Sequence, residues 1–346
     1  MNNKCFIFKS YVLTWIYVFM TGGKHITQGP YNVIDLIYRF GAKDYKKTDL
    51  LKELVSVAYN YGKYNFHVDE YFMYNVKDLS AIGKRKFITE ETRWGYYDKL
   101  NKRDNIPLFD DKEKCYSLFA NYYHREVVAI KGVEDRNKYD DFILQYKKII
   151  LKPLSSSGGK GVRLFNHALD SLELLLEEYA EGFVMEPAIE NSCEMAEFHK
   201  ESLNTVRVAT VRMDDRVEIG FAVARFGNGG ACVDNFSHGG IIGVIDLQSG
   251  RIYASKDKRG SRYIVHPSSN KLLLGYQIPQ WEELVALVME LAYIVPTNRY
   301  TGWDMAHTKD GWILVEANAR GQFISQAPAN EGIKERFDSY LKELGL

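Results

Sequence analysis

The hydrophobic pattern of the chain changes character about a third of the way along its length. Before that point, apolar residues recur at helical spacing, as in NVIDLIYRF (32–40) and TDLLKELVSVAYNYG (48–62), which predicts amphipathic helices. After it, short runs rich in β-branched residues predict strands, beginning with YKKIILKPL (146–154) and its return partner VRLF (162–165). The pattern therefore predicts a helical, Tyr-rich N-terminal region followed by a part that contains many strands.

Strands and helices alternate irregularly through this second part. Helices are predicted over 167–182, 279–295 and 331–344, and strands over 183–189, 204–213, 218–226, 240–247, 251–255, 302–308 and 312–318. The order lacks the regular strand–helix–strand alternation of a Rossmann domain and is typical of the α+β class. We predict a mostly helical region 1–105, a small lobe 106–182 with a phosphate-binding loop, and a large lobe 183–346 with a metal site.

Composition and charge argue against a nucleic-acid partner and against a structure held by disulfides or zinc. The 346 residues include 45 basic and 45 acidic side chains, so the formal net charge is zero. This balance argues against a broad basic surface for nucleic acid. The four cysteines, at positions 5, 115, 193 and 232, form no CxxC or Cys/His pattern. We therefore expect neither a disulfide framework nor a structural zinc site, and the cysteine usage fits a reducing cytoplasm.

An apolar stretch, CFIFKSYVLTWIYVFM, occupies residues 5–20. Lys9 interrupts it, and it is short for a helix that spans a membrane. No small-residue cleavage site of a secretory signal follows it. Two interpretations stay open, a buried helix and a segment that contacts a membrane peripherally.

Lys152 ends a predicted strand and is followed by a loop of small and basic residues. Glycines let backbone N–H groups approach phosphate oxygens, serines add hydroxyl donors, and lysines offset the negative charge. The loop is not a Walker A motif, because GxxxxGK[ST] is absent and a strand follows instead of a helix. A flexible hairpin loop without a ligand is the alternative. The loop consists of Ser155, Ser156, Ser157, Gly158, Gly159, Lys160 and Gly161.

Three oxygen-bearing side chains lie on the last predicted strand pair. Glu316 and Asn318 are two residues apart on one strand and therefore point to the same face. Asp304 lies on the partner strand. Two carboxylates and an amide oxygen are ligands suited to Mg²⁺. A solvated acidic edge is the alternative, but Glu316 follows a strongly apolar run, where an unpaired carboxylate would be unfavourable.

Four further charged residues lie in or beside predicted strands and helices. Glu186 ends the strand FVME, which could run beside an adenine, and the later Glu194 could hold ribose hydroxyls. Surface placement is the alternative for Glu194. Arg207 and Arg225 lie within apolar strands, where an arginine needs an anionic partner. That partner is either a structural acid or a transferred phosphoryl group.

A polar, glycine-rich loop, VDNFSHGG, occupies residues 233–240. Either it binds substrate or it forms only a tight turn. His238 is a candidate base, although a lone loop histidine more often serves only as a hydrogen-bonding residue. The candidate substrate-binding residues are Asp234, Asn235, His238, Gly239 and Gly240.

Taken in order, these segments resemble the ATP-grasp superfamily, and in detail its sugar-transfer-associated branch, which is related to the glutamate-ligase-like members. The resemblance extends from about residue 110 to about residue 330 and rests on the ordered series. The series is DDK (110–112), KPLSSSGGKG (152–161), FVMEPAI (183–189), NTVRV (204–208), RFGNGGACVDNFSHGG (225–240), HP (266–267), IPQW (278–281) and GWDMAHTKDGWILVEAN (302–318).

The resemblance implies an ATP-grasp fold, in which two α+β lobes clamp the nucleotide. Lys112 and Lys152 would contact the phosphates of ATP, and residues 155–161 would close over them. The segment from Glu186 to Ile189 would line the adenine. One departure concerns the ribose, because Asn191 stands where we expect a glutamine.

The resemblance also implies roles on the large lobe. Arg207 and Arg225 would face the γ-phosphate or an acylphosphate. Many ATP-grasp ligases carry an arginine on the metal-bearing strand, whereas here Gly302 stands near that point. The implied Mg²⁺ ligands are Asp304, Glu316 and Asn318.

The activity implied by the resemblance is ATP- and Mg²⁺-dependent joining of a carboxylate to an amine through an acylphosphate. The name of the branch suggests a sugar or polysaccharide precursor of a surface glycan, so the expected partners are a small-molecule or glycan-linked carboxylate and an amine. Two alternatives stay open, an ATP-dependent small-molecule or sugar kinase and a nucleotide-binding scaffold without turnover. A glycosyltransferase is disfavoured because no DxD-like motif follows a Rossmann-type series of strands.

Overall fold

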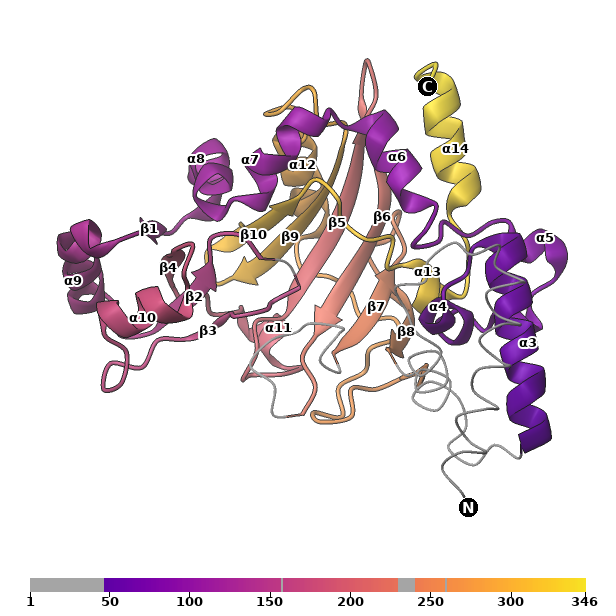
Figure 1. Cartoon of the computed structure of the whole chain (residues 1–346), viewed down its shortest axis with the longest axis horizontal. Coiled ribbons are helices and arrows are strands. Elements are labelled where there is room, and N and C mark those ends of the chain that lie inside the picture. The colour runs from indigo at the N-terminus through magenta and orange to yellow at the C-terminus, as the bar shows by residue number, and fades with distance from the viewer. Residues whose placement is uncertain (1–46, 157, 230–239, 259) are drawn as a thin grey trace, which may run out of the picture.

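The computed structural model of the chain describes residues 47–346 except residues 157, 230–239 and 259. Its strands form two antiparallel sheets with helices packed around them (Figure 1). The helices α3 (Lys47–Tyr64) and α5 (Ala81–Lys84) lie at the end of the molecule opposite the smaller sheet. The predicted α+β class is confirmed, as is the helical character of the described part of the N-terminal region. The apolar stretch 5–20 lies outside the described residues.

The larger sheet has six strands in the order β10-β9-β5-β6-β7-β8. The last two strands in the sequence form the predicted hairpin, with Gly311 paired to Thr308 at its turn. Because β10 is an edge strand, one side of its backbone is open to contacts outside the sheet. The strands are β5 (Thr205–Arg212), β6 (Val217–Phe226), β7 (Ile241–Ile245), β8 (Ile252–Asp257), β9 (Tyr300–Thr308) and β10 (Gly311–Asn318).

Helices cover both faces of the six-stranded sheet. On one face, α8 (Lys112–Tyr123) and α12 (Trp281–Leu291) bury apolar side chains against Val206, Val208 and Trp303. On the other face, α6 (Arg93–Leu100) and α14 (Lys334–Glu343) pack on Val211 and Tyr300. Burial of these two apolar faces is the main source of the sheet's stability.

The smaller sheet has four strands in the order β1-β4-β2-β3, and it forms the core of the small lobe with α9 (Arg136–Gln145) and α10 (Leu172–Glu178). The predicted hairpin of β2 and β3 is confirmed. The division into lobes stays a prediction, but β4 pairs with β1 and β2 and so favours a boundary after residue 187. The strands are β1 (Val128–Ile130), β2 (Ile149–Pro153), β3 (Arg163–Leu164) and β4 (Phe183–Pro187).

The helices before residue 90 dock onto the large lobe through the Gln326 side chain. Its amide accepts a hydrogen bond from the Ile88 N–H at 2.9 Å and donates one to the Ile88 carbonyl at 2.8 Å. No helix in the described part of the chain is both long and apolar enough to cross a membrane. The remaining elements are α3 (Lys47–Tyr64), α4 (Val68–Met73), η1 (Val76–Asp78), α5 (Ala81–Lys84), η2 (Arg103–Asn105), α7 (Ile106–Asp110), η3 (Val133–Asp135), α11 (Cys193–Ala196) and α13 (Gln326–Ala329).

The Glu70 carboxylate is buried where α4 meets the segment before α6, with 5% of the residue exposed. It accepts hydrogen bonds from the N–H groups of His67 at 3.0 Å and Glu90 at 2.8 Å. Burial nevertheless raises the pKa of Glu70 to about 8. The folded protein therefore retains a proton that the unfolded chain releases near the usual glutamate pKa of 4.5.

This difference predicts the pH dependence of stability. Between about pH 5 and 8 the folded state binds more protons at Glu70, so the free energy of unfolding should fall by up to about 1.4 kcal/mol per pH unit as pH rises. Glu70→Gln lacks this contribution and should show a flatter profile in denaturant titrations at several pH values. Parallel profiles for the two proteins would contradict the assignment.

Candidate active site

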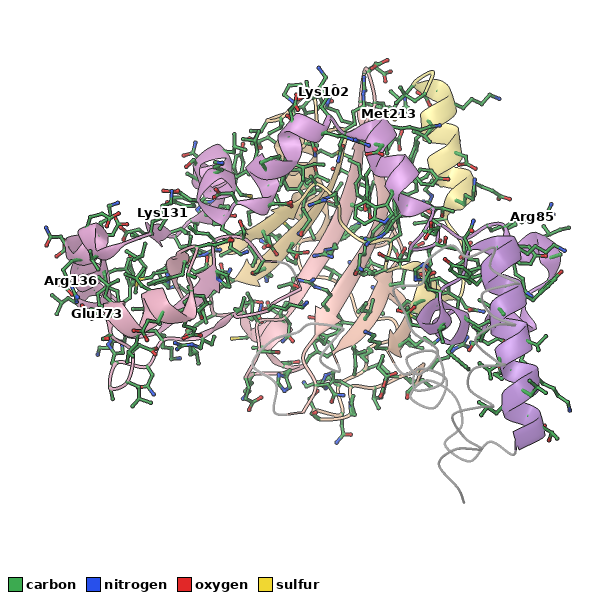
Figure 2. All side chains as sticks on the ribbon, in the orientation of Figure 1. Arg85, Lys102, Lys131, Arg136, Glu173 and Met213 are labelled. Carbon is green, nitrogen blue, oxygen red and sulfur yellow. The ribbon has the colours of Figure 1, made fainter. Side chains whose placement is uncertain are left out.

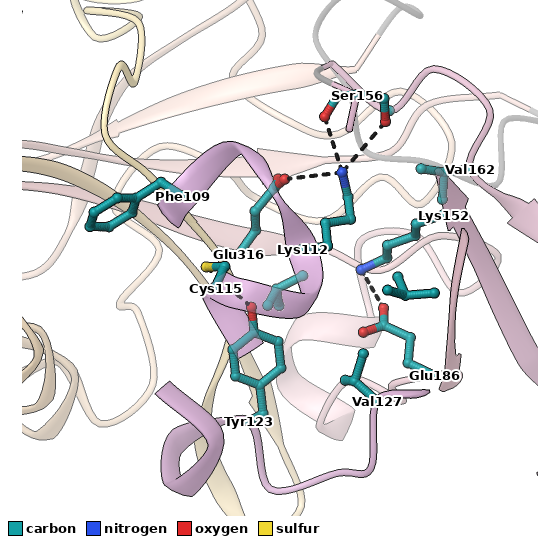
Figure 3. Close-up of a pocket in the computed structure, with 13 residues that line it drawn as sticks. Phe109, Lys112, Cys115, Tyr123, Val127, Lys152, Ser156, Val162, Glu186 and Glu316 are labelled. Carbon is teal, nitrogen blue, oxygen red and sulfur yellow. Dashed lines mark hydrogen bonds and ion pairs between the residues drawn. The ribbon is translucent and has the colours of Figure 1, made fainter. Parts of the chain in front are cut away.

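A pocket lies between the two sheets, where α8 and the loop after β2 approach the edge strand β10 (Figure 3). Both lobes contribute charged side chains to it, including Lys152 from β2 and Glu316 from β10. The pocket therefore brings together two parts of the predicted site that lie far apart in the sequence. The lining residues are Phe109, Lys112, Cys115, Tyr123, Val127, Lys152, Ser156, Gly159, Val162, Val184, Glu186, Val315 and Glu316.

Lys112 is the first residue of α8, and the Asp111 side chain caps the helix by accepting N–H bonds from residues 113 and 114. The Lys112 ammonium donates to the Ser156 carbonyl at 3.0 Å and lies 4.0 Å from the Glu316 carboxylate. Burial lowers the pKa of Lys112, although Glu316 acts in the opposite direction. The lysine thus connects the predicted phosphate loop to the predicted metal strand.

The predicted phosphate-binding loop needs glycine at its turns. Gly158, Gly159 and Gly161 have φ values of +70°, +73° and +73°, which other residues adopt only with strain. A Cβ on Gly161 would also lie 2.8 Å from Pro153 Cγ. Of the seven predicted loop residues, Ser156 and Gly159 border the pocket, Ser157 lies outside the described residues, and the others are exposed.

A buried carboxylate holds two cations on the small-lobe side of the pocket. The Glu186 carboxylate forms an ion pair with the Lys152 ammonium. It also accepts bonds from Arg125 Nε at 3.1 Å and Nη2 at 2.8 Å. Burial alone would raise the pKa of Glu186, but attraction to Arg125 and Lys152 outweighs burial and lowers it. Glu186 is therefore a charged counter-ion inside the pocket.

A second buried carboxylate holds two arginines on the large sheet. Asp304 on β9 lies opposite Arg207 on β5 and accepts bonds from its Nε and Nη2, each at 2.6 Å. Arg225 Nη2 on β6 lies 3.2 Å from the same carboxylate. Burial would raise the pKa of Asp304, but the two arginines lower it. The predicted strand arginines therefore have a structural acid as partner in this state.

A β-bulge in β10 turns Glu316 toward Asp304 and its two arginines. Leu314 and Ala317 both pack in the core beneath α8, so strict alternation from Leu314 would have buried Glu316 on that apolar side. The register shifts between Leu314 and Glu316, which inserts Val315 and places Glu316 opposite Asp304. Asn318 then lies opposite Gly302.

A profile of the family described as sugar-transfer associated ATP-grasp matches residues 91–342. The chain belongs to this family. The predicted ATP-grasp fold is thereby confirmed, with its two α+β lobes facing each other across the pocket.

Solved structures with a similar fold share little sequence with this ATP-grasp protein. The ATP-grasp ligase PsnB, solved with minimal precursor, Mg and ADP, is 15% identical with a TM-score of 0.44, over 71% of this chain and 62% of that chain. The D-Ala:D-Ser ligase VanG from Enterococcus faecalis is 14% identical with a TM-score of 0.44, over 68% and 61%. The chain thus covers less than two thirds of the length of each of these proteins. No curated protein matches it.

The three predicted metal ligands differ in the contacts that their side chains make in this structure. Glu316 and Asn318 present oxygen atoms from one face of β10, and the Glu316 side chain is 37% exposed at the pocket. This donor set fits Mg²⁺. Asp304 is instead bound by Arg207 and Arg225, and no group of three His, Cys, Asp or Glu residues suited to a metal occurs among the described residues. Asp304 would have to release an arginine to bind Mg²⁺.

Two predicted nucleotide contacts lie away from the pocket. Glu194 is exposed on α11, and Ile189 follows the end of β4 without bordering the pocket. Asn191 instead exchanges hydrogen bonds with the backbone of Asn204 at 2.7 and 2.8 Å. Among the predicted substrate residues, Gly240 is buried directly before β7, and Asp234, Asn235, His238 and Gly239 lie outside the described residues. These assignments stay predictions.

Several residues of the pocket carry no signal in the sequence. Phe109, Tyr123 and Val127 look like ordinary core residues, and Cys115 belongs to no motif. Arg125 contacts the pocket residue Glu186 without bordering the pocket itself, and it stands just before the short strand β1, where a charged residue is unremarkable. Only their packing between the lobes places them at the site.

The thiols of Cys115 and Cys193 provide a chemical test of the pocket. Cys115 is buried and its pKa is raised by burial to about 11, whereas Cys193 is exposed. Because only the thiolate reacts, iodoacetamide at about pH 8 should modify Cys115 at least about 100 times more slowly than Cys193. Peptide mass spectrometry over time measures both rates in one sample. Comparable rates would contradict the closed arrangement of α8 against β10.

Proposed function

We propose that this protein is an ATP- and Mg²⁺-dependent ligase that joins a carboxylate to an amine through an acylphosphate. The observation that carries the proposal is the meeting of Lys112, Lys152 and Glu316 at one pocket between the lobes of an ATP-grasp fold. Two cations beside a glycine loop suit a polyphosphate, and an adjacent carboxylate suits its metal ion.

Phosphate binding would exchange the present partners of the two lysines. Lys152 is paired with Glu186, and Lys112 is bonded to Ser156. Phosphate oxygens carry more negative charge than a carbonyl or a shared carboxylate, so they would attract both ammonium groups away from these partners. Backbone N–H groups of the glycine loop would add donors and limit the access of water to a reactive acylphosphate.

Glu316 and Asn318 would hold Mg²⁺, with Asp304 as the third ligand once it is released from an arginine. When bound, the ion would neutralise charge on the phosphoryl oxygens. Asp304 would thereby free Arg207 or Arg225 to face the transferred phosphoryl group, to which each would offer several N–H donors. Such preorganised charge is the principal means of catalysis in phosphoryl transfer.

The proposed reaction needs no nucleophile from the protein. A substrate carboxylate oxygen attacks the γ-phosphorus as the bond to ADP breaks, which gives the acylphosphate. The amine nitrogen then attacks the carbonyl carbon, phosphate leaves, and the nitrogen loses a proton. The family description favours a sugar or polysaccharide precursor as one substrate, and the proposed setting is the cytoplasm, with peripheral membrane contact through the N-terminal stretch.

A second cavity offers room for one of the two substrates. Acidic and basic side chains border it, together with the segment after β10. This segment passes close to Arg207, because a Cβ on Gly302 would lie 3.5 Å from Gly321 Cα and 3.8 Å from Arg207 Cδ. Residues 69–90 of the cavity lining precede the family match, so they would distinguish this member from its relatives. The lining is Asp69, Glu70, Met73, Tyr74, Ile88, Thr89, Glu90, Arg93, Lys258, Gln322, Phe323, Ile324 and Ala327.

Isotope transfer tests the proposed reaction. The protein is incubated with ATP, Mg²⁺, and pairs of ¹⁸O-labelled carboxylates, such as uronic and amino acids, with amines. The ligase should release ADP and phosphate and should place one carboxylate ¹⁸O in the phosphate. A stable phosphorylated product without free phosphate would identify a kinase instead, and ADP formation without label transfer would contradict the acylphosphate.

A carboxylate substitution tests the metal assignment. Glu316→Gln keeps the size of the side chain but removes the charge that would bind Mg²⁺, so ADP release should fall by about 100-fold or more. Asp310→Asn, in the exposed turn of the same hairpin, is the matched control and should stay within about 2-fold of wild type. Equal activity of the two variants would remove Glu316 from the metal site.

A further inference from the structure

Arg125 joins the two lobes through one buried guanidinium group. Its side chain is 6% exposed and binds Glu186 on β4 through Nε and Nη2. The same group donates from Nη1 to the Leu314 carbonyl at 2.7 Å and from Nη2 to the Val315 carbonyl at 3.4 Å, both on β10. Nη1 also donates to the Tyr123 carbonyl at 3.0 Å. One side chain thus contacts both sheets and the end of α8.

The carbonyls that Arg125 binds belong to the bulge of β10. The register shift lies between Leu314 and Glu316, and a bulge disrupts the local ladder of backbone hydrogen bonds. Since β10 is an edge strand, these carbonyls need a donor from outside the sheet. Arg125 supplies that donor at the two residues that immediately precede Glu316.

We propose that Arg125 is a positioning residue that sets the place of the metal-binding Glu316 relative to the phosphate-binding Lys152. The proposal rests on the proposed function, because it assumes that Glu316 serves Mg²⁺ and Lys152 serves ATP. Arg125 connects the two through Glu186 on one side and the bulge carbonyls on the other. The bulge in turn directs Glu316 toward Asp304.

Arg125 also contributes to the charge balance around the buried Glu186 carboxylate. With both Arg125 and Lys152 as partners, Glu186 can lose Lys152 to a phosphate and still keep a counter-ion. Without Arg125, the buried Glu186 would retain Lys152 more strongly and would repel phosphate. Positioning and charge can therefore be separated by two substitutions at one residue.

The two substitutions are Arg125→Lys and Arg125→Gln. The lysine keeps the charge beside Glu186, but one ammonium group cannot reproduce the planar fork that reaches Glu186 and the bulge carbonyls together. The glutamine removes the charge as well. The matched controls are Arg136→Lys and Arg136→Gln, because Arg136 lies beside Glu173 at the outer end of the small lobe, away from β10 (Figure 2).

Calorimetric titration with a non-hydrolysable ATP analogue, in Mg²⁺ and in EDTA, measures both effects. Arg125→Lys should bind the analogue in EDTA as wild type does, whereas the gain in affinity from Mg²⁺ should shrink by about tenfold or more, as for other residues that orient metal ligands. Arg125→Gln should lose affinity in EDTA too. The Arg136 variants should match wild type in both conditions.

The outcomes of this titration distinguish a failure of the role proposed for Arg125 from a failure of the proposed function. Wild type without Mg²⁺-dependent binding would reject the proposed function itself. Wild type with such binding, together with a full Mg²⁺ gain in Arg125→Lys, would overturn the role of Arg125 alone. A loss of EDTA affinity in Arg125→Lys equal to that in Arg125→Gln would also overturn it, because charge and position would then be inseparable.

Hydrogen exchange on the wild-type protein keeps the proposal testable even where the variants do not fold. Addition of the analogue in EDTA should slow exchange in peptides over 183–187 and also over 311–318, because Arg125 connects β4 to β10. Protection confined to the small-lobe strand would overturn the coupling. The 136–145 helix serves as the reference peptide, since it lies outside the connection.

Discussion

Two buried carboxylates, one on each sheet, each hold two cations. Glu186 holds Lys152 and Arg125 on the small lobe, and Asp304 holds Arg207 and Arg225 on the large sheet. Cations kept out of water need such partners, since an isolated buried charge would be strongly unfavourable. In an ATP-grasp fold the same cations are suited to phosphate. We propose that a nucleotide replaces the anions of these ion pairs, of which Glu186 and Lys152 border the pocket.

Because buried cations need these partners, the arrangement of the pocket depends on the positions of the two strands β4 and β10. Glu186 lies on β4, which pairs between β1 and β2, and it borders the pocket. Glu316 faces Asp304 only because β10 carries a bulge. Arg125 contacts both strands. We propose that this contact sets the direction of Glu316 relative to Lys152.

The sequence could predict those features that depend on local pattern. The glycine loop follows from its composition, and the placement of Asp304 and Glu316 on two paired strands follows from a hairpin with an obvious turn. The bulge could not be predicted, because a register shift depends on packing against α8 and on donors supplied by another segment. For the same reason the arginine partners of Asp304 stayed open, and Arg125 was missed. Long-range contacts, not propensities, determine these features.

Binding of Mg²⁺ and nucleotide by the wild-type protein tests the central claim most directly. Purified protein is titrated calorimetrically with a non-hydrolysable ATP analogue in the presence of Mg²⁺ and again in EDTA. If phosphate replaces the anions of the internal ion pairs, binding should be saturable at one site and should be stronger in the presence of Mg²⁺. The absence of binding in both conditions would contradict the claim and would leave the ion pairs of Glu186 and Asp304 with a purely structural role.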